Sequence, residues 1–295
     1  MKKQTAIILL IIVTVIWGGG FIGIKMALNL GVSVGLLNMI RGFIFSLLVL
    51  IFFPQAVLHM SKPQLKIGLL VGVFNFGGFI LQCIGAQYTT PSNSSFLTTT
   101  NVVMVPILAW AMYKLRPKIK NFVAIAVCLA GMAILTGALS AKFVLNVGDL
   151  YTIAGAFFFA LSIVMLAKPP EGGHFAAGAF LLGVTLFLGS AVYFFTVEGG
   201  VVPNIDWRLA ILPILYLSIG SNFIAQTLQI VAQRHLSAST ASLIMVLEGV
   251  FGSIFSILFG YEPFTLSLLL GGALIIFSLI LSELQILPKN KKRIK

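Results

Sequence analysis

Long apolar stretches, each about the length of a bilayer crossing, alternate with short polar connections along this chain. A helix needs about 20 apolar residues to cross the hydrocarbon core of a membrane. Ten stretches meet that requirement, and because they lack the strict alternation of β-strands, the pattern predicts helices. The predicted helices span residues 6–28, 33–53, 65–87, 92–113, 119–138, 149–166, 176–197, 208–232, 237–260 and 264–283.

An internal repeat divides these predicted helices into two sets. The segment Ala86–Arg116 runs from a polar turn into an apolar stretch and ends before a proline, and Ala232–Glu262 has the same order of features. A shift of 146 residues aligns the two segments without a gap. Identical residues are few, so the evidence is the shared register of turn, apolar stretch and proline.

The repeat predicts the domain organisation. We expect a first five-helix repeat over residues 1–140, a second over 141–285 and a basic cytoplasmic tail over 286–295. Because five is odd, the second repeat enters the membrane from the opposite side. The predicted fold is therefore an all-α integral membrane protein with ten transmembrane helices in two inverted five-helix repeats. Inverted repeats are a recurring plan of secondary transporters, which bind their solute near the bilayer midplane.

The composition agrees with a chain that is solvated largely by lipid. Hydrophobic residues make up 59% of the 295 residues and charged residues only 9%, whereas a soluble domain carries about 25% charged residues. The net charge of +12 is not arranged as a groove or stripe, which argues against a nucleic-acid partner. Cys83 and Cys128 lie in apolar stretches without the spacing of a disulfide or metal site.

Basic residues are unevenly divided between the two ends of the predicted helices. With ten helices both termini lie on one side, and that side carries 15 of the 19 Lys and Arg residues. The opposite side carries Lys142 and Arg208, while Lys25 and Arg41 lie within predicted helices. Because cytoplasmic loops are enriched in Lys and Arg, we expect a multi-pass protein of the plasma or inner membrane with both termini cytoplasmic.

Several short motifs occur in a defined order along the chain. They are WGGGF at 17–21, Arg41 in the second predicted helix, NVVMVPILAW at 101–110, Gly148-Asp149 at the start of the second repeat, and LEGVFG at 247–252. In this order they resemble the EamA family of the drug/metabolite transporter superfamily. The resemblance covers about residues 5–285. It implies ten helices, an inverted-repeat bundle around a central cavity, and export of small metabolites, amino acids or drugs. Gly249 departs from the family, which commonly has Pro there and a helix kink.

Three charged residues lie inside the predicted helices rather than in their first or last two residues, and a charge deep in the bilayer costs at least ~2.5 kcal/mol. Lys25 lies about one turn from a helix end, so we expect its ammonium group to extend to the interface. Arg41 lies deeper. It either pairs with a solute carboxylate in a transport pathway or anchors helix-end carbonyls. Glu248 is either a proton-coupling carboxylate or a structural hydrogen-bonding group.

Polar side chains recur at helical spacing in several predicted helices. Asn222, Gln226, Gln229 and Gln233 share one helical face. Because amides in lipid would leave donors unpaired, this face contacts either a wet cavity or polar groups of other helices. The candidate substrate-binding residues are Arg41, Asn75, Phe79, Gln82, Thr98, Asn101, Asn222, Gln226 and Gln229, with Glu248 as the proton-coupling candidate. Phe21 and Phe223 are further candidates for lining a cavity.

These features predict a secondary-active transporter, with export as the expected direction, for small metabolites, amino acids or drugs. Alternating access would occur around a midplane cavity. No Gly-Lys pair exists for a Walker A motif, so the energy would come from a gradient. We expect no cofactor, metal or catalytic residue. The expected partners are a small-molecule substrate, the lipid bilayer and, as a candidate coupling ion, the proton. The expected assembly is a monomer or weak dimer.

Two alternatives remain open at this stage. The first is a metabolite exchanger or facilitator that needs no ion gradient. Flux that survives collapse of the proton gradient would favour it. The more distant alternative is an intramembrane enzyme. Such an enzyme needs a carboxylate pair or a metal cluster, and Glu248 is the only carboxylate deep within a predicted helix.

Overall fold

Helices account for all regular secondary structure in the computed structural model, which describes residues 1–116, 119–135, 146–202 and 204–283. Within these ranges, eight helical segments are long and apolar enough to cross a membrane, and two shorter apolar helices accompany them. The predicted all-helical membrane class is confirmed, but eight rather than ten segments reach the length of a full crossing. The predicted domain boundary at 140 and the tail over 286–295 lie outside the described residues.

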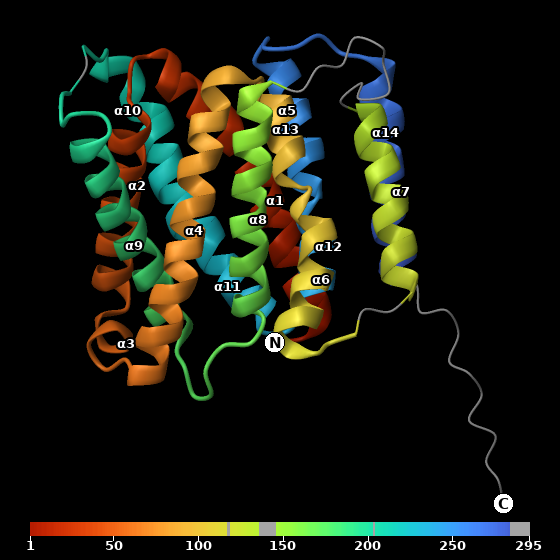
Figure 1. Ribbon diagram of the computed structural model, residues 1–295, viewed down its shortest axis with the longest axis horizontal. Coiled ribbons are helices and arrows are strands. Elements are labelled where there is room, and N and C mark those ends of the chain that lie inside the picture. The colour runs from red at the N-terminus through yellow and green to blue at the C-terminus, as the bar shows by residue number, and fades with distance from the viewer. Residues whose placement is uncertain (117–118, 136–145, 203, 284–295) are drawn as a thin grey trace, which may run out of the picture.

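The elements follow one another as a bundle of antiparallel neighbours (Figure 1). The first half contains α1 (Lys3–Asn29), α2 (Val34–Phe52), α3 (Pro54–Leu58), α4 (Lys62–Tyr88), α5 (Pro91–Thr98), α6 (Asn101–Tyr113) and α7 (Ile119–Leu135). The second half contains α8 (Val147–Leu166), α9 (Phe175–Thr196), α10 (Trp207–Leu215), the π-helical segment η1 (Tyr216–Gln226), α11 (Thr227–Gln233), α12 (Ala238–Met245), α13 (Leu247–Leu258) and α14 (Leu266–Glu283). The ends of the predicted helices agree with these bounds to within a few residues wherever the structure describes them.

Polar side chains set the first residues of several helices. The Ser61 hydroxyl accepts a hydrogen bond from Gln64 N, and Gln64 Oε1 accepts one from Ser61 N at 2.9 Å. Asn146 and Asp149 form the same reciprocal pair at the start of α8, with both distances 3.0 Å. Such capping boxes satisfy backbone donors that have no partner within the helix. Asp149 also accepts a hydrogen bond from Thr89 Oγ1 at 3.0 Å, which ties the end of α4 to the start of α8.

Glycines allow α2 and α9 to cross with their backbones in contact. A Cβ atom at Gly42 of α2 would lie 2.7 Å from the Cα of Phe187 in α9. In return, a Cβ atom at Gly183 of α9 would lie 2.8 Å from the backbone nitrogen of Ser46 in α2. Neither position has room for a side chain, and small residues are the usual means of close helix packing in membranes.

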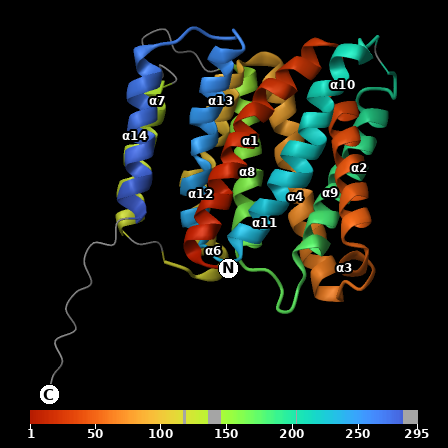
Figure 2. The ribbon, with the colours of Figure 1, turned by 180° about the vertical axis from the view of Figure 1, so that it is seen from behind.

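Contacts between the two halves follow a reciprocal pattern (Figure 2). The second crossings, α2 and α9, pack on each other, and so do α7 and α14. Helix α4 packs along α8, and the corresponding segments α10, η1 and α11 pack along α1. Helices α5 and α6 contact α8, while α12 and α13 contact α1. Each half therefore contributes the same set of surfaces to the interface.

Two crossings are interrupted at matching positions of the repeat. Helix α5 ends at Thr98 and α6 begins at Asn101, whereas α12 ends at Met245 and α13 begins at Leu247. At the first interruption, hydroxyls of the connecting threonines donate to carbonyls three residues earlier and so compete with helical hydrogen bonds. At the second, the helix is interrupted without the Pro that the family commonly has after the Glu, with Gly249 in its place.

The third crossing of the second half contains a π-helix, η1, whose turns are wider than those of an α-helix. Pro213 in α10 lacks an N–H group and clashes with the preceding turn, and the chain continues as the π-helix η1. Such segments are rare and frequently lie at functional sites. The corresponding helix α4 of the first half remains regular. The π-helix carries Asn222 and Gln226, two of the predicted site residues.

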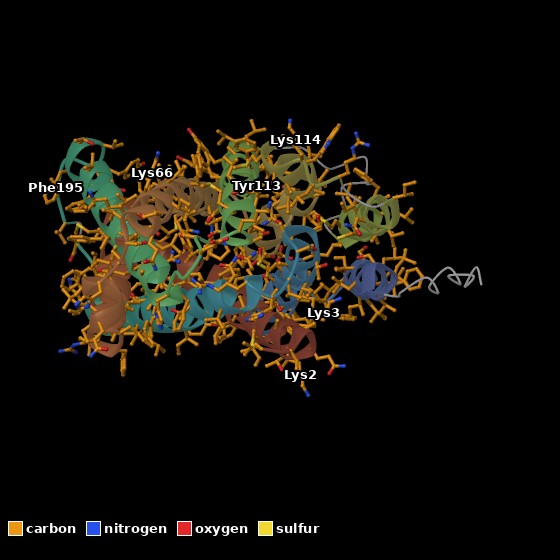
Figure 3. All side chains as sticks on the ribbon, turned by 90° about the horizontal axis from the view of Figure 1, so that it is seen from below. Lys2, Lys3, Lys66, Tyr113, Lys114 and Phe195 are labelled. Carbon is orange, nitrogen blue, oxygen red and sulfur yellow. The ribbon has the colours of Figure 1, made fainter. Side chains whose placement is uncertain are left out.

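Basic side chains of the described part of the chain gather at the end that holds the N-terminus. Figure 3 looks onto this end from below and labels Lys2, Lys3, Lys66 and Lys114. Arg208, near the start of α10, lies at the opposite end of the bundle. Several basic residues assigned to the predicted cytoplasmic side, including those at 289–295, lie outside the described residues.

Candidate functional site

A cavity of about 50 Å³ lies at the centre of the bundle, between α1, α2, α4, α8, η1, α11 and the two interrupted crossings. One water molecule needs roughly 10–15 Å³ by this measure. The cavity therefore has room for several waters or for a small solute. Its walls come from both halves of the chain, and its position matches the interruptions of α5–α6 and α12–α13.

Nine of the ten predicted site residues line this cavity. They are Arg41, Asn75, Phe79, Gln82, Thr98, Asn101, Gln226, Gln229 and Glu248. The tenth, Asn222, does not line the cavity but holds the side chain of Arg41. The structure thus brings together residues that lie up to about 200 positions apart in the sequence.

Arg41 is fully buried and contributes a positive charge to the cavity wall. Its Nε donates to Asn222 Oδ1 at 2.9 Å, and its Nη1 donates to Asn38 Oδ1 at 3.1 Å. The guanidinium carbon lies 4.7 Å from the centre of the Phe79 ring. These partners orient the guanidinium without neutralising it, because no carboxylate of the described residues pairs with it. The predicted alternative, an anchor for helix-end carbonyls, does not describe these contacts.

Glu248 lies in the first turn of α13 and is 5% exposed. Its carboxyl group faces the cavity and has no hydrogen-bonding or ionic partner among the residues that the structure describes. A buried carboxyl without a partner is unfavourable as an anion. The start of a helix offsets part of this cost, because its dipole favours negative charge. Glu248 is therefore placed to take a proton, a cation or a donor from the cavity.

Amide side chains form two hydrogen-bonded pairs across the cavity wall. Gln226 Nε2 donates to Gln229 Oε1 at 2.9 Å, and Gln82 Nε2 donates to Thr98 Oγ1 at 3.1 Å. Asn101 Oδ1 is buried and accepts no hydrogen bond within the described part of the chain. Asn101 lines the cavity, but this oxygen is shielded in the present conformation, so a bound molecule reaches it only if the side chain turns.

The four amides predicted to share a helical face are all buried, so that face contacts protein rather than lipid. Only Gln226 and Gln229 of the four line the cavity. Gln233 is the last residue of α11, and neither its Nε2 nor its Oε1 has a hydrogen-bonding partner among the described residues.

Several cavity residues escaped the sequence analysis. Trp17 lines the cavity and donates from Nε1 to the Ser221 carbonyl at 3.0 Å. Phe159 and Ser162 of α8 and Met245 of α12 also line the cavity. The WGGGF motif was a signal for Trp17, but Phe159, Ser162 and Met245 lie in apolar stretches that look alike on every face.

Of the two phenylalanines expected as further candidates for the cavity wall, one lines the cavity. Phe223 stacks on Phe52 with 5.6 Å between ring centres and does not line the cavity, whereas Phe21 does. Lys25, which we expected to extend its ammonium group to the interface, contacts backbone carbonyls near the end of α4. Its Nζ donates to the carbonyls of Ala86 and Thr89 at 2.9 and 3.1 Å. A cation is favourable at this place, because carbonyls at the end of α4 have no partner within the helix.

Comparison with known proteins shows the family of this chain. A profile of the EamA-like transporter family matches residues 4–137 and 146–284, which correspond to the two halves described above. The chain belongs to the EamA-like transporter family. An uncharacterized transporter of Archaeoglobus fulgidus is 29% identical over 288 residues, which cover 97% of this chain and 88% of that protein. Solute carrier family 35 member F2 of Mus musculus is 28% identical over 139 residues, which cover 43% of this chain and 36% of that protein.

A solved crystal structure has the same fold as this EamA-like transporter. The two structures superpose with a TM-score of 0.73 over 96% of this chain and 98% of the other, at 17% sequence identity. At that identity the likeness concerns the fold alone. Family membership and the transporter relatives identify the EamA-like protein as a multi-pass membrane transporter. Its central cavity lies between the two matched segments.

Proposed function

We propose that this EamA-like protein is a secondary transporter that exports a small solute bearing a carboxylate, such as an amino acid. The observation that carries the proposal is Arg41, a buried cation that lines the central cavity and has no ionic partner in the described part of the chain. A guanidinium group binds a carboxylate through two parallel hydrogen bonds. A solute carboxylate would act as the ionic partner that Arg41 lacks among the described residues.

Other groups of the cavity suit the remainder of such a solute. The Glu248 carboxyl group would accept a hydrogen bond from a solute ammonium group, and the unpaired Asn101 oxygen would accept a second one once its side chain turns towards the cavity. Trp17, Phe21 and Phe159 supply an aromatic wall for an apolar side chain. A cavity of about 50 Å³ limits the solute to a small one in this conformation.

We further infer that the protein has ten crossings in two inverted five-helix repeats, with α7 and α14 as the fifth crossing of each. The reciprocal contacts between the halves support this inference. So do the two matched family segments and the interruptions at corresponding positions. An odd number of crossings in the first repeat makes the second enter from the other side. The basic end of the bundle would face the cytoplasm of a cell that carries the protein in its plasma or inner membrane.

Two contacts at opposite ends of the central cavity would open alternately. At the upper end in Figure 1, α5 packs on α13, and Ser92 Oγ lies 2.7 Å from Ser253 Oγ. At the lower end, α6 packs on α12 through apolar side chains that include Val105, Ala109 and Ile244. The two contacts are counterparts in the repeat. Separation of one while the other stays closed would expose the cavity to one side of the membrane.

Glu248 is the proposed coupling group, which takes up a proton on one side and releases it on the other. The alternative that remains is an exchanger in which Glu248 only binds the solute. Neither alternative needs a catalytic residue or a cofactor.

Flux into liposomes tests the proposed function. Purified protein is reconstituted, and uptake of labelled amino acids is followed with and without an imposed pH gradient. We expect Arg41→Gln to lower flux about 10- to 100-fold, because a hydrogen bond to a charged group contributes about 1.5–3 kcal/mol. Lys66→Gln, which removes an exposed charge outside the cavity, is the control. Wild-type flux of carboxylate solutes in Arg41→Gln would overturn the proposal.

The same assay tests coupling separately. Glu248→Gln keeps a side-chain oxygen that accepts a hydrogen bond from the solute, so it should still exchange solute at a lower rate. It should lose its response to the pH gradient, because the amide cannot carry the proton. An unchanged response in Glu248→Gln would remove the coupling role and leave the solute site in place. Wild-type flux that does not respond to the gradient would favour the exchanger.

A further inference from the structure

A second cavity, of about 40 Å³, is lined by the first turns of α4, the last residues of α8 and the first turns of α9. These segments lie at the end of the bundle that holds the N-terminus (Figure 1). We call this second cavity the lower cavity. Helices α4, α8 and α11 line both cavities, so the two are stacked along the same three helices. Helix α9 and the α8–α9 connection close the remaining side of the lower cavity.

Arg234 supplies a positive charge to the lower cavity. Its Nη1 donates to the Gly173 carbonyl at 2.6 Å, while its buried Nε has no partner among the described residues. No carboxylate of the described chain forms an ion pair with it. Burial lowers the pKa of the Arg234 guanidinium, because the charged form loses hydration. An anion bound beside it would offset that cost.

The other two polar side chains of this wall also offer donors. Gln64 uses its Oε1 to accept from Ser61 N at 2.9 Å, which leaves the NH2 group for another partner. His174 Nδ1 accepts from Ala176 N at 3.2 Å, so the neutral ring carries its proton on Nε2. Neither Asp nor Glu is among the described residues that line the lower cavity. Its polar chemistry therefore suits an anion and no cation.

The rest of the wall is apolar and leaves open space. Ile67, Val71, Leu182 and Ile230 line it. At Gly178 of α9, an added Cβ atom would meet nothing within 4 Å. The lower cavity thus has a donor-rich part and an apolar part, which is the pattern of a site for an amphiphile.

The repeat gives the lower cavity a counterpart region at the opposite end of the bundle, and in the described part of the chain that region contains a filled apolar core instead of a cavity. The counterpart region lies between α1, α2, α4 and α10. There the space is filled by a cluster of buried apolar side chains that includes Ile24, Leu36, Leu37, Ile214 and Leu217. Among the described residues, the lower end of the bundle differs from the upper end in having both an unpaired guanidinium nitrogen, Arg234 Nε, and unfilled space.

We propose that the lower cavity is a second binding site, which takes the carboxylate or phosphate group of an amphiphilic ligand. Arg234, Gln64 and His174 would bind the anionic group, and the apolar wall would take the adjoining carbon atoms. The ligand has two potential sources: a soluble amphiphile, or an anionic phospholipid of the adjacent leaflet, whose headgroup basic pockets of membrane proteins bind. The site does not depend on which solute the central cavity binds.

Thermal unfolding in nanodiscs tests this site, because a ligand that binds only the folded protein raises its Tm. The protein is placed in phosphatidylcholine discs, and two probes are compared. In one arm, part of the lipid is replaced by phosphatidylglycerol. In the other, soluble hexyl phosphate is added to discs of phosphatidylcholine alone. We expect at least one probe to raise the Tm of the wild-type protein, and the arm that responds identifies the source.

Three variants decide whether the effect arises in the lower cavity. Arg234→Gln removes the charge. It should lower about tenfold the affinity for the probe that raises the Tm, as expected for the loss of one charge-assisted hydrogen bond. Gly178→Phe fills the open space without changing charge and should abolish the response. Lys66→Gln removes an exposed charge from the same end of the bundle and should respond like the wild type. The proposal is overturned if neither probe raises the Tm, or if the response is the same in all four proteins. Either result would leave the solute site of the central cavity untouched.

Discussion

Asn222 acts on the central cavity through Arg41 rather than by lining it. Its Oδ1 accepts the Arg41 Nε at 2.9 Å from the opposite half of the chain. The amide holds the guanidinium in place but leaves its charge uncompensated. A carboxylate at the same position would hold it equally well and neutralise it.

Replacing the Asn222 amide by a carboxylate therefore tests its effect on solute binding separately from its effect on stability. We expect Asn222→Asp to keep the Tm of the wild-type protein, because Arg41 gains an ionic partner, and to lose transport of carboxylate solutes. Asn222→Leu should lower the Tm, because it leaves Arg41 Nε buried and unpaired at a cost of about 1–3 kcal/mol. Flux assays and thermal unfolding check both variants. Full transport by Asn222→Asp would show that the charge of Arg41 is not what binds the solute.

At the scale of the helices, the crossing of α2 and α9 depends on two glycines. The two backbones are in contact at Gly42 of α2 and at Gly183 of α9. A methyl group at either place meets main-chain atoms, which cannot rotate away as a flexible side chain can.

Gly42→Ala should therefore destabilise the protein by about 1–3 kcal/mol, the usual cost of overpacking. Gly178→Ala is the matched control, because it lies on α9 and its added Cβ meets nothing within 4 Å. The control should be neutral or slightly stabilising, since Ala favours helix over Gly by about 1 kcal/mol. Thermal unfolding of the two purified variants compares them. Equal Tm values would mean that α2 and α9 do not cross as closely as described.

The contact between α5 and α13 offers a second test at this scale. Ser92 and Ser253 hydroxyls lie 2.7 Å apart, so cysteines at both positions should form a disulfide under oxidation. We expect the double variant Ser92→Cys/Ser253→Cys to lose flux when oxidised and to recover it when reduced, because α5 must leave α13 for the cavity to open there. Each single variant is a control. Full flux in the oxidised, cross-linked protein would rule out this opening.

At the scale of the whole molecule, the proposed inversion of the repeats would place corresponding segments on opposite sides of the membrane. Lys66 near the start of α4 and Arg208 near the start of α10 are both exposed and occupy corresponding crossings. The native cysteines, Cys83 and Cys128, are buried, so labelling of an introduced thiol would have little background.

Cysteine labelling of intact cells tests the inversion and the orientation together. Arg208→Cys should react with an impermeant reagent from outside, whereas Lys66→Cys should react only after the membrane is opened. The reverse pattern would keep the inversion but turn the molecule over. Reaction of both from the same side would contradict the inverted repeats.

The helices, the repeat and most of the cavity residues were predictable from the amino-acid order. Lipid excludes unpaired backbone groups, so apolar stretches of sufficient length have to become helices. Polar residues in such stretches are costly unless they face inwards, which singled out Arg41, the amides and Glu248. The same reasoning could not find Phe159 or Met245, because an apolar side chain is favourable on every face of a membrane helix, whether that face contacts lipid or protein.

The partners of those residues depended on the folded arrangement. The sequence order does not reveal that Asn222 meets Arg41, that Phe223 turns towards Phe52, or that Lys25 caps α4, because these contacts join segments that come together only when the helices pack. The wide turn of η1 and the hollow beside Arg234 have the same origin. Solvation by lipid decides which stretches become helices and which faces turn inwards. Close packing decides which side chains meet and where space is left between them.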